Sequence, residues 1–329
     1  MNKILKVIIS PTFVYYYLSL KITKIYPTLL PDSLILSAIF YFEMGRKLNL
    51  RHPSTFNEKL QWLKIYNRRP EYTTMVDKFA AKNYVANLIG ERYIIPTLGV
   101  WDSFDQIDFD KLPNQFVLKT THDSGSVVIC KDKSSFNKLR AREVLTNSLH
   151  NDFYLQWREW PYKNVPHRII AEKFMVDSER PNDSIIDYKF TCFNGHAENV
   201  MACYERETGD PKFYFFDRNW NLLRLNKRGL NAPQGFTMPK PINIDEMFYI
   251  AGRLSEKLPY ARIDLYEING QIYFSEITFF PDSGLDQNLL PETDKYYGNK
   301  IKLPVLNNYI NLKKKQNENN RLSDQSQRE

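Results

Sequence analysis

The amino-acid sequence predicts an α+β fold. Helix-like and strand-like segments alternate irregularly, no long strand–helix–strand series is visible, and several strand pairs are separated only by short turns. With 329 residues, 43% of them hydrophobic and 25% charged, the chain has the composition of a globular protein with two or three structural domains. We therefore expect these domains to share one active cleft.

Residues 1–75 are expected to be helical. Their first part, Val7–Leu20, is apolar and aromatic, but it is too short to span a bilayer and contains Pro11. Lysines flank this stretch on both sides, at Lys3, Lys6, Lys21 and Lys24. The segment therefore suits either contact with an anionic lipid surface or packing against the rest of the protein.

Two helices are predicted before the first strand pair. Pro53–Tyr66 has a capping signal, with Ser54 or Thr55 as the cap and Glu58 completing a capping box. The second helix is expected over Tyr72–Leu88.

A strand pair with a mobile tip is predicted next. Phe116–Thr120 is a β-rich run that contains Lys119, a polar loop follows at Thr121–Ser126, and Val127–Cys130 resumes the strand. The other expected elements are strands at Tyr93–Pro96, Arg168–Met175 and Ile185–Phe193, further strands to about Phe216, a helix from Ser134 or Ser135 to about His150, and a helix at Ile244–Lys257 capped by Asn243 and Glu246.

The most informative segment is a predicted hairpin formed by Tyr260–Ile268 and Gln271–Phe279. Polar and apolar residues alternate in its first strand, which places Arg262 and Asp264 on one face. Glu276 lies in a dense apolar run of the second strand, where an unpaired charge is costly. We therefore expect these charged side chains to form a site rather than an incidental surface group.

The turn of this hairpin decides whether the two acids meet. A two-residue turn at Asn269-Gly270 puts Asp264 and Glu276 on opposite faces, although Asn-Gly favours that turn. A three-residue loop, or an equivalent bulge, sets Asp264 opposite Glu276 and Arg262 opposite Thr278. Because two facing carboxylates and a neutral oxygen suit Mg²⁺ bound to phosphate, we predict the longer loop or a bulge.

Charge and cysteine usage restrict the partners. The net charge is +7 with a pI near 9.0, which favours ATP, phosphorylated carriers, acidic glycans or an anionic membrane. We find no zinc-finger spacing, RNA-recognition signature or isolated basic helix, so no nucleic-acid partner is expected. The three cysteines are widely spaced and no secretory signal of normal pattern is present, which indicates a reduced, cytoplasmic protein.

The hairpin pattern, Arg262-Ile263-Asp264 followed by Glu276-Ile277-Thr278, resembles the metal-binding hairpin of the ATP-grasp superfamily. More closely, the chain resembles the TupA-like ATP-grasp family found with polysaccharide gene clusters and often labelled glycosyltransferase. The phrases that carry this resemblance are Pro53–Lys59, Asp77-Lys78, Phe116–Lys119, Asp187–Lys189 and the final hairpin.

This resemblance implies an ATP-grasp fold, in which two α+β lobes clamp ATP, with a helical N-terminal extension. The implied organisation is a helical, membrane-proximal region at 1–75, a small lobe with a phosphate flap at 76–170, a large lobe with the metal hairpin at 171–312, and a disordered, charged tail at 313–329.

The resemblance also implies roles for particular residues. For ATP these are Lys78 and Lys119 on the phosphates, Ser124, Gly125 and Ser126 in the flap, Glu172, Lys173, Phe174 and Met175 in the adenine hinge, and Asp177 or Glu179 at the ribose. For catalysis they are Lys189 and Arg262, and for Mg²⁺ they are Asp264, Glu276 and Thr278, the last in place of the usual Asn.

The implied activity is ATP- and Mg²⁺-dependent joining of a carboxylate to an amine through an acyl phosphate. The implied substrates are an acidic glycan or sugar-linked carrier and an amine, such as a uronic acid and an amino acid, used at the inner face of the cell membrane.

Two other hypotheses stay open. Asp108-Phe109-Asp110 is a D-x-D motif that suits a metal-dependent glycosyltransferase, although it precedes a polar linker typical of a surface loop. A non-catalytic nucleotide-binding scaffold is the third hypothesis, and Thr278 in place of Asn is the feature that favours it.

Overall fold

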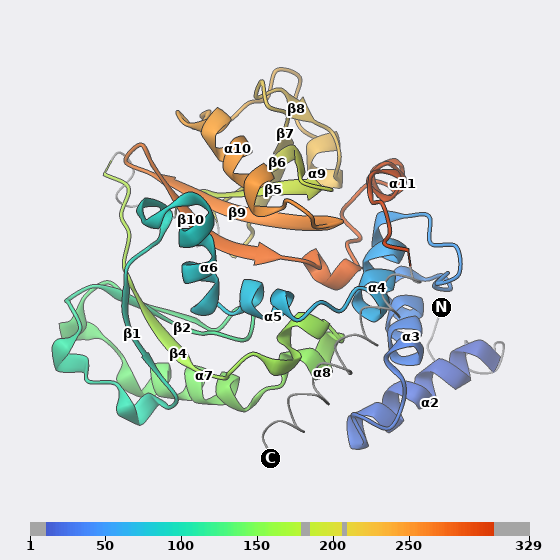
Figure 1. Cartoon of the computed structure of the whole chain (residues 1–329), viewed down its shortest axis with the longest axis horizontal. Coiled ribbons are helices and arrows are strands. Elements are labelled where there is room, and N and C mark those ends of the chain that lie inside the picture. The colour runs from blue at the N-terminus through green and yellow to red at the C-terminus, as the bar shows by residue number, and fades with distance from the viewer. Residues whose placement is uncertain (1–10, 179–184, 206–208, 306–329) are drawn as a thin grey trace, which may run out of the picture.

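The structure is a computed structural model that describes residues 11–178, 185–205 and 209–305. Its described part contains two antiparallel sheets with helices packed against them, which confirms the predicted α+β class (Figure 1). The smaller sheet has four strands in the order β1–β4–β2–β3. Their bounds are Thr97–Trp101 for β1, Ile169–Lys173 for β4, Phe116–Thr120 for β2 and Val127–Cys130 for β3.

The larger sheet has six strands in the order β10–β9–β5–β6–β7–β8. They run over Gln271–Thr278 (β10), Tyr260–Ile268 (β9), Asp187–Phe193 (β5), His196–Tyr204 (β6), Lys212–Phe216 (β7) and Leu222–Leu223 (β8). The hairpin at Asn269-Gly270 therefore lies at one edge of this sheet, as β9 and β10.

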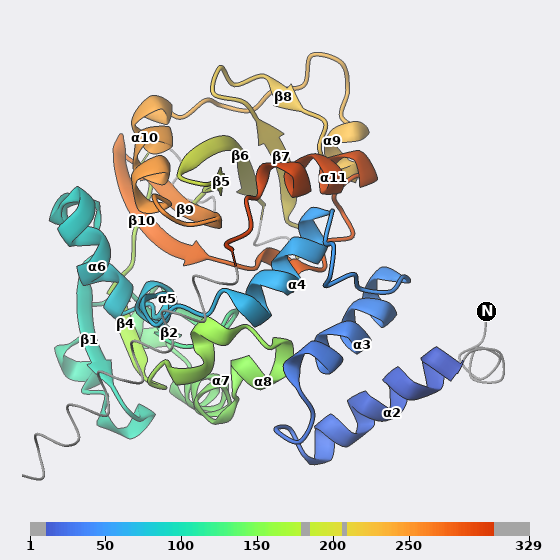
Figure 2. The same ribbon diagram turned by 45° about the vertical axis from the view of Figure 1, so that its right-hand side comes forward.

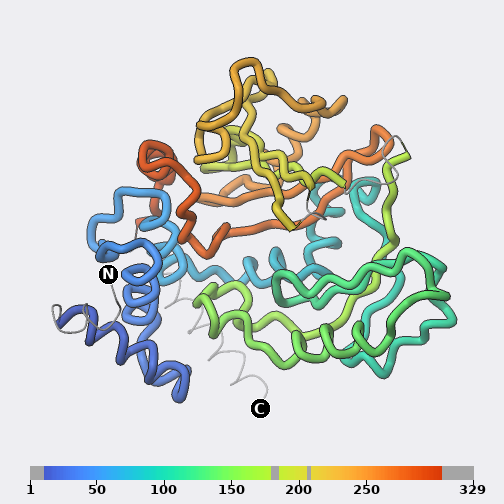
Figure 3. Tube along the Cα trace, turned by 180° about the vertical axis from the view of Figure 1, so that it is seen from behind, coloured from blue at the N-terminus to red at the C-terminus, as the bar shows by residue number. Residues whose placement is uncertain are grey.

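Each sheet has its own apolar core. Helix α7 (Lys138–His150) packs against β2, and Ala141 and Leu145 join the smaller core. Helix α10 (Ile244–Leu254) covers the larger sheet through contacts with β5, β6 and β9. These two cores hold the sheets as separate layers, and the chain from α4 to α6 runs between them (Figure 3).

Helix α4 (Phe56–Tyr66) confirms the capping box predicted for it. The Thr55 side chain accepts a hydrogen bond from the backbone of Glu58, and the Glu58 carboxylate accepts one from Thr55 in return. On its far side α4 packs against α11 (Pro291–Lys300). There a Cβ atom on Gly298 would come within 2.3 Å of the Ser54 carbonyl oxygen, so only glycine permits this approach.

The single helix predicted over Tyr72–Leu88 is wrong, because the chain forms α5 (Glu71–Val76) and α6 (Ala80–Ile89) with a break between them. Asp77 adopts an extended conformation at the break and its side chain accepts a hydrogen bond from Phe79 N. The carboxylate of Asp77 also pairs with Arg168 at 2.8 Å. These tertiary contacts override the helical propensity of the segment.

The first helices lie beside the two lobes (Figure 2). Helix α2 (Pro11–Ile25) packs on α3 (Asp32–Met44), mainly through Phe13 and Phe42, whose ring centroids lie 5.1 Å apart. Among the described residues, no helix is both long enough and apolar enough to cross a bilayer.

Several predicted boundaries are corrected. Residues 91–93 form a 3₁₀ turn and the first strand begins at Thr97, α7 begins at Lys138 with Asn137 as its cap, and Asn243 makes no side-chain cap on α10. Glu246 binds Arg92 and Tyr93 instead of closing a capping box. The tail at 313–329 lies outside the described residues. The remaining short helices are α8 (Phe153–Trp157) and α9 (Lys227–Leu230).

Candidate functional site

The β9–β10 hairpin combines a tight turn with a bulge. Asn269 and Gly270 have φ values of 53° and 71°, as a two-residue turn requires, so the predicted three-residue loop is wrong. The register then shifts between Phe274 and Glu276, which leaves Ser275 as an extra residue. The bulge therefore replaces the loop, and it sets Asp264 opposite Glu276, as the second form of the prediction required.

The register places the predicted residues in two rows across three strands. Lys189 on β5 pairs with Asp264 on β9, which pairs with Glu276 on β10. The neighbouring row is Thr191, Arg262 and Thr278. Because residues paired in a sheet project to the same face, this arrangement brings the predicted catalytic and metal-binding side chains together.

Arg262 lies at the centre of this cluster. Its guanidinium donates to both oxygens of Asp264 at 2.7 Å, to Glu276 Oε1 at 2.9 Å and to Thr278 Oγ1 at 3.1 Å. Lys189 donates to Asp264 Oδ2 and also pairs with Asp187 at 2.6 Å. Asp264 is fully buried, and these cations supply the partners that a buried carboxylate needs.

The two facing acids differ in proton affinity. Burial raises the pKa of Asp264 to about 6, against the opposing charges of Arg262 and Lys189. Partial burial would also raise the pKa of Glu276. The charges of Arg262, Lys189 and Lys78 outweigh this effect and lower the pKa to about 2. Both carboxylates are therefore ionised at neutral pH.

The donor set suits Mg²⁺ in its chemistry. Two carboxylates and one hydroxyl are hard oxygen donors, and the Glu276 side chain is 41% exposed. Asp264 is less open, because Arg262 and Lys189 already occupy both of its oxygens. An ion held by all three residues would thus have to displace Arg262 from part of the cluster. Among the described residues, no group of three or more His, Cys, Asp or Glu side chains forms a metal site.

Lys78 lies at the break between α5 and α6 and faces the flap at Thr121–Ser126. Its backbone N–H donates to Thr121 O at 3.1 Å, and its ammonium donates to Thr120 O at 3.0 Å and to Asp123 O. The ammonium also lies 3.7 Å from Asp123 Oδ1. Burial lowers the pKa of Lys78, and the charge of Asp123 opposes that shift. This lysine is thus held where the flap begins.

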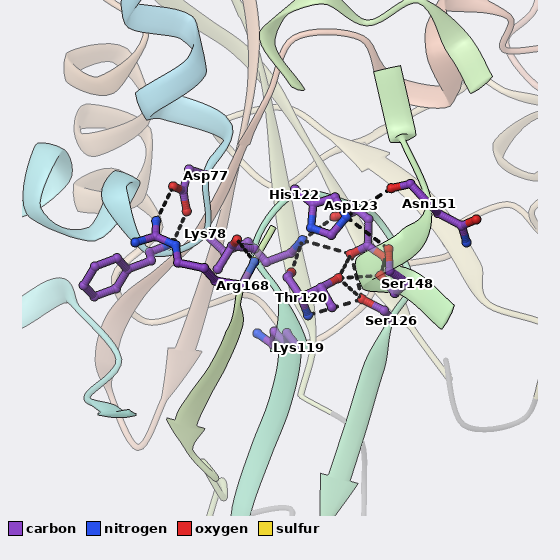
Figure 4. A network of polar contacts seen from close by, with 12 residues as sticks. Asp77, Lys78, Lys119, Thr120, His122, Asp123, Ser126, Ser148, Asn151 and Arg168 are labelled. Atoms are coloured by element: carbon purple, nitrogen blue, oxygen red, sulfur yellow. Dashed lines mark hydrogen bonds and ion pairs between the residues drawn. The ribbon is translucent and has the colours of Figure 1, made fainter. Parts of the chain in front are cut away.

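Asp123 organises the flap (Figure 4). Its carboxylate accepts hydrogen bonds from the hydroxyls of Thr120, Ser126 and Ser148, at 2.5 Å for Thr120 and 2.7 Å for Ser126. Ser126 is therefore buried, whereas Ser124 and Gly125 are exposed at the tip. Burial would raise the pKa of Asp123, but Lys78 and the hydroxyl donors outweigh it and lower the pKa. The tip remains the open part of the flap.

Lys119 and Glu172 project from the same face of the smaller sheet. Lys119 Nζ lies 2.7 Å from one carboxylate oxygen of Glu172, and Lys82 Nζ on α6 lies 2.5 Å from the other. Burial would raise the pKa of Glu172, but the two lysines outweigh it and lower the pKa to about 2. The Glu172 side chain therefore holds two cations next to each other.

The predicted hinge, Glu172–Met175, begins in the last two residues of β4 and continues beyond the strand. Lys173 donates its backbone N–H to Pro96 O at 3.0 Å, and Phe174 and Met175 continue the chain as half-buried residues. Beyond them Ser178 N donates to Asn269 Oδ1 at 2.8 Å, which ties this segment to the β9–β10 turn. The hinge thus links the two sheets. Asp177 is buried, and Glu179 lies outside the described residues.

A cavity of about 790 Å³ opens beside the cluster. Lys189, Arg262, Glu276 and Thr278 line one end, next to Asp123 and Ser124 of the flap. Aromatic side chains such as Trp157 and Tyr260 also line the cavity, as do the acids Glu159, Asp282 and Asp286. It is large enough for a substrate-sized molecule next to the cluster.

The sequence analysis assigned no role of their own to four of the charged residues in this region: Lys82, Asp123, Glu159 and Asp187. Lys82 stands four residues after Lys78, a spacing that gives neighbouring side chains on a continuous helix. Lys78 lies in the break between α5 and α6, however, so the helical spacing does not relate the two lysines here. Asp187 shares its strand face with Lys189, so alternation could have indicated it.

The D-x-D motif has a local role. Asp108 caps a 3₁₀ turn by accepting a hydrogen bond from Asp110 N at 3.1 Å, and its carboxylate lies 3.1 Å from the exposed Lys111 ammonium. Neither Asp108 nor Asp110 is among the described residues that line the cavity.

Similar folds occur among solved structures. D-alanine–D-alanine ligase from Bacillus anthracis complexed with ATP is 16% identical, with 82% of this chain and 78% of that chain covered and a TM-score of 0.40. D-alanyl-alanine synthetase A from Vibrio cholerae is 12% identical, with 74% of this chain and 68% of that chain covered and a TM-score of 0.40. A RimK domain ATP-grasp protein from Sphaerobacter thermophilus is 9% identical, with 70% of this chain and 69% of that chain covered and a TM-score of 0.38.

No curated protein matches the chain. A family model described as TupA-like ATPgrasp matches residues 58–302, from within α4 to just beyond α11. The match includes both sheets, the flap, the hinge and the hairpin. It confirms the resemblance noted in the sequence: the chain belongs to the TupA-like ATP-grasp family.

Proposed function

We propose that this protein is an ATP- and Mg²⁺-dependent carboxylate–amine ligase that modifies a bacterial surface polysaccharide or its precursor. Family membership supports the ATP-dependent ligase class. The observation that carries the proposal in this chain is the row of Lys189, Asp264 and Glu276, with Arg262 beside it, at one end of the cavity.

In the proposed reaction, a carboxylate oxygen of the acid substrate attacks the γ-phosphorus of ATP, and ADP leaves. The amine, after losing the proton of its ammonium form to water, then attacks the acyl carbon through its nitrogen. The bond from that carbon to the phosphate oxygen breaks, phosphate leaves with the electron pair, and the nitrogen gives up a second proton to water as the amide forms. Such chemistry requires positioning and charge stabilisation rather than a covalent nucleophile on the protein. Arg262 is suited to stabilise the developing negative charge, and Lys189 keeps Asp264 ionised and oriented.

ATP would bind between the two sheets. Lys78 and Lys119 would contact its phosphates, the exposed amides at Ser124 and Gly125 would cover them, and the backbone from Lys173 to Met175 would meet the adenine. Glu276, Thr278 and Asp264 are the side chains that would hold Mg²⁺, which neutralises phosphate charge when bound.

The proposed product is an amide, such as one between a glycan uronic acid and an amino acid. The test combines the purified protein with ATP, MgCl₂, a uronic-acid glycan and an amino-acid pool. We expect phosphate release that needs both organic substrates, together with an amide detected by mass spectrometry. Release of UDP from a UDP-sugar without ATP consumption would instead support a glycosyltransferase, and a stable phosphorylated product would indicate a kinase.

Helix α2 supports a proposed location at the inner face of the cell membrane. Tyr15, Leu18, Ile22 and Ile25 follow helical spacing on one face and are each 39–71% exposed. The described helix carries two exposed lysines, Lys21 and Lys24, and no acidic residue. An exposed apolar stripe next to positive charge fits the surface of an anionic bilayer.

A further inference from the structure

The charged residues that line the cavity form two groups. At the hairpin end, the cations Arg262 and Lys189 stand among the acids of the cluster. Apart from Asp123 in the flap, the other charged residues among the described lining residues are all acidic and lie outside the hairpin, and we call this group the acidic end: Glu43, Glu159, Asp282 and Asp286. An end of this kind attracts cations and repels carboxylates.

Glu159 is the innermost of these acids. It is 4% exposed, and its Oε1 accepts a hydrogen bond from the Ser283 hydroxyl. None of the described residues donates a hydrogen bond to Oε2, although the residue lines the cavity. Because Glu159 lines the cavity, a ligand there could donate a hydrogen bond to this oxygen.

Lys64 does not supply that missing donor. This buried lysine donates to the carbonyl oxygens of Trp157 and Ser283, each at 2.9 Å, and its charge acts on Glu159 from a greater distance. Arg262, the other cation that acts on Glu159, is already bound to Asp264 and Glu276. Burial raises the pKa of Glu159, against the charges of both cations.

Asp282 and Asp286 form the outer part of the acidic end. Asp282 and Ser283 adopt left-handed backbone conformations, with φ values of 46° and 52°, which non-glycine residues rarely take. The turn they form follows β10 and places Asp282 beside Asp286. Burial and the charge of Asp282 raise the pKa of Asp286 to about 6. A cation between these two acids would relieve their repulsion.

We infer that the amine substrate binds at this acidic end as a cation whose charge is not cancelled by a carboxylate of its own, with Glu159 as its innermost partner. The inference rests on the proposed ligase function and narrows its amine. An amino sugar, a diamine or an amino acid with a blocked carboxyl group fits the charge of this end, whereas a free α-amino acid brings a carboxylate that the four acids repel.

The test uses two probes of nearly equal size, glycinamide and glycine, which differ in the carboxylate. Binding of each to the full-length protein with Mg²⁺ and ADP is followed by ligand-observed NMR titration. We expect glycinamide to bind at least tenfold more tightly than glycine, and Glu159→Gln to remove most of this preference. Equal binding of the two probes, or tighter binding of glycine, would overturn the inference.

Glu159→Gln leaves buried Lys64 without its nearest acid, so a second variant is needed in case it fails to fold. The double variant Asp282→Asn, Asp286→Asn removes the outer acids and should lower the preference for glycinamide severalfold. Asp245→Asn, an exposed acid paired with Arg218, is the matched control and should leave the preference unchanged. A preference that survives in both cavity variants would also overturn the inference.

The same samples separate this inference from the ligase proposal. Titration with ADP and Mg²⁺ reports on the nucleotide site, which the cavity variants should leave intact. If the wild-type protein binds no nucleotide, the ligase proposal fails. If it binds nucleotide but shows no preference between the amines, only the inference about the amine fails.

Discussion

Asp123 pairs with Lys78 in the flap: the carboxylate oxygen Oδ1 lies 3.7 Å from the lysine ammonium. A phosphate group of ATP would carry the same sign of charge as this carboxylate and would compete for the same lysine. If nucleotide binds at the proposed site, Asp123 would therefore oppose its binding, in addition to ordering the hydroxyls of Thr120, Ser126 and Ser148.

The first prediction follows from that pair. Asp123→Asn keeps a side chain of the same shape but removes the negative charge, so we expect ATP to bind about three- to tenfold more tightly, corresponding to roughly 1 kcal/mol. Isothermal titration calorimetry with a non-hydrolysable ATP analogue measures the change. Weaker binding by the variant would show that ordering the flap matters more than the charge of Asp123.

The second prediction concerns the facing acids. Asp264→Asn or Glu276→Gln should abolish ATP turnover, because each removes one of the carboxylates proposed to hold Mg²⁺. Both variants should remain folded by circular dichroism. Asp108→Ala is the control and should turn over ATP at the wild-type rate, since Asp108 caps an exposed turn. Wild-type rates in either hairpin variant would refute the metal assignment.

The third prediction concerns Lys119. Lys119→Ala should weaken binding of the ATP analogue by about tenfold or more, because it removes a cation proposed to contact phosphate. Lys111→Ala is a suitable control, since Lys111 is exposed and lies beside Asp108. Unchanged affinity in Lys119→Ala would mean that Lys119 serves only to pair with Glu172.

The fourth prediction concerns stability and pH. The folded pKa of Glu172 is about 2, below its ordinary value of 4.5, so its ionised form stabilises the fold above about pH 5 and that contribution is lost as the pH falls towards 2. At pH 7 Glu172→Gln should lower the free energy of unfolding by about 2–3 kcal/mol, since burial of Lys82 offsets part of the effect.

Urea denaturation of both proteins between pH 7 and pH 3 measures this difference. The gap between wild type and Glu172→Gln should narrow as the pH falls. A gap that is the same at pH 7 and pH 3 would contradict the assigned pKa shift.

The fifth prediction concerns the membrane. The double variant Leu18→Ser, Ile22→Ser should reduce co-sedimentation with vesicles that contain anionic phospholipid, because it removes apolar area from the exposed stripe of α2. Ile242→Ser, a 79% exposed apolar residue elsewhere, is the matched control. Equal sedimentation of the wild type with neutral and anionic vesicles would count against a role for Lys21 and Lys24.

The hairpin illustrates what the sequence could and could not predict. Alternation placed Arg262 and Asp264 on one face, and the chemistry of the acids required Glu276 to join them. The need for a longer loop or a bulge was predicted, but the sequence did not show which of the two occurs or that the bulge falls at Ser275, because nothing in Ser275 itself distinguishes a bulged residue from a paired one. The tight Asn269-Gly270 turn and the functional pairing are therefore compatible.

Residues that depend on distant contacts were harder to predict. The break at Asp77 depends on Arg168, which lies far along the chain, and local propensity favoured one continuous helix. Glu159 has no neighbouring motif, and only the folding of the chain brings it to the cavity that contains Arg262. Local patterns thus indicated the strands and the residues proposed to hold Mg²⁺, whereas the acidic end of the cavity required the tertiary structure.

The close approach of Gly298 to Ser54 has a practical consequence for shortened versions of the protein. Backbone meets backbone there, so the close fit of α11 against the chain just before α4 depends on residues 54–56. A truncation that starts at residue 75 would remove this contact and the Phe56 ring that packs on Tyr297, and would leave α11 held, among the described residues, only by the larger sheet, through residues such as Phe193 and Asn199. Expression trials should therefore keep every residue from 53 onward.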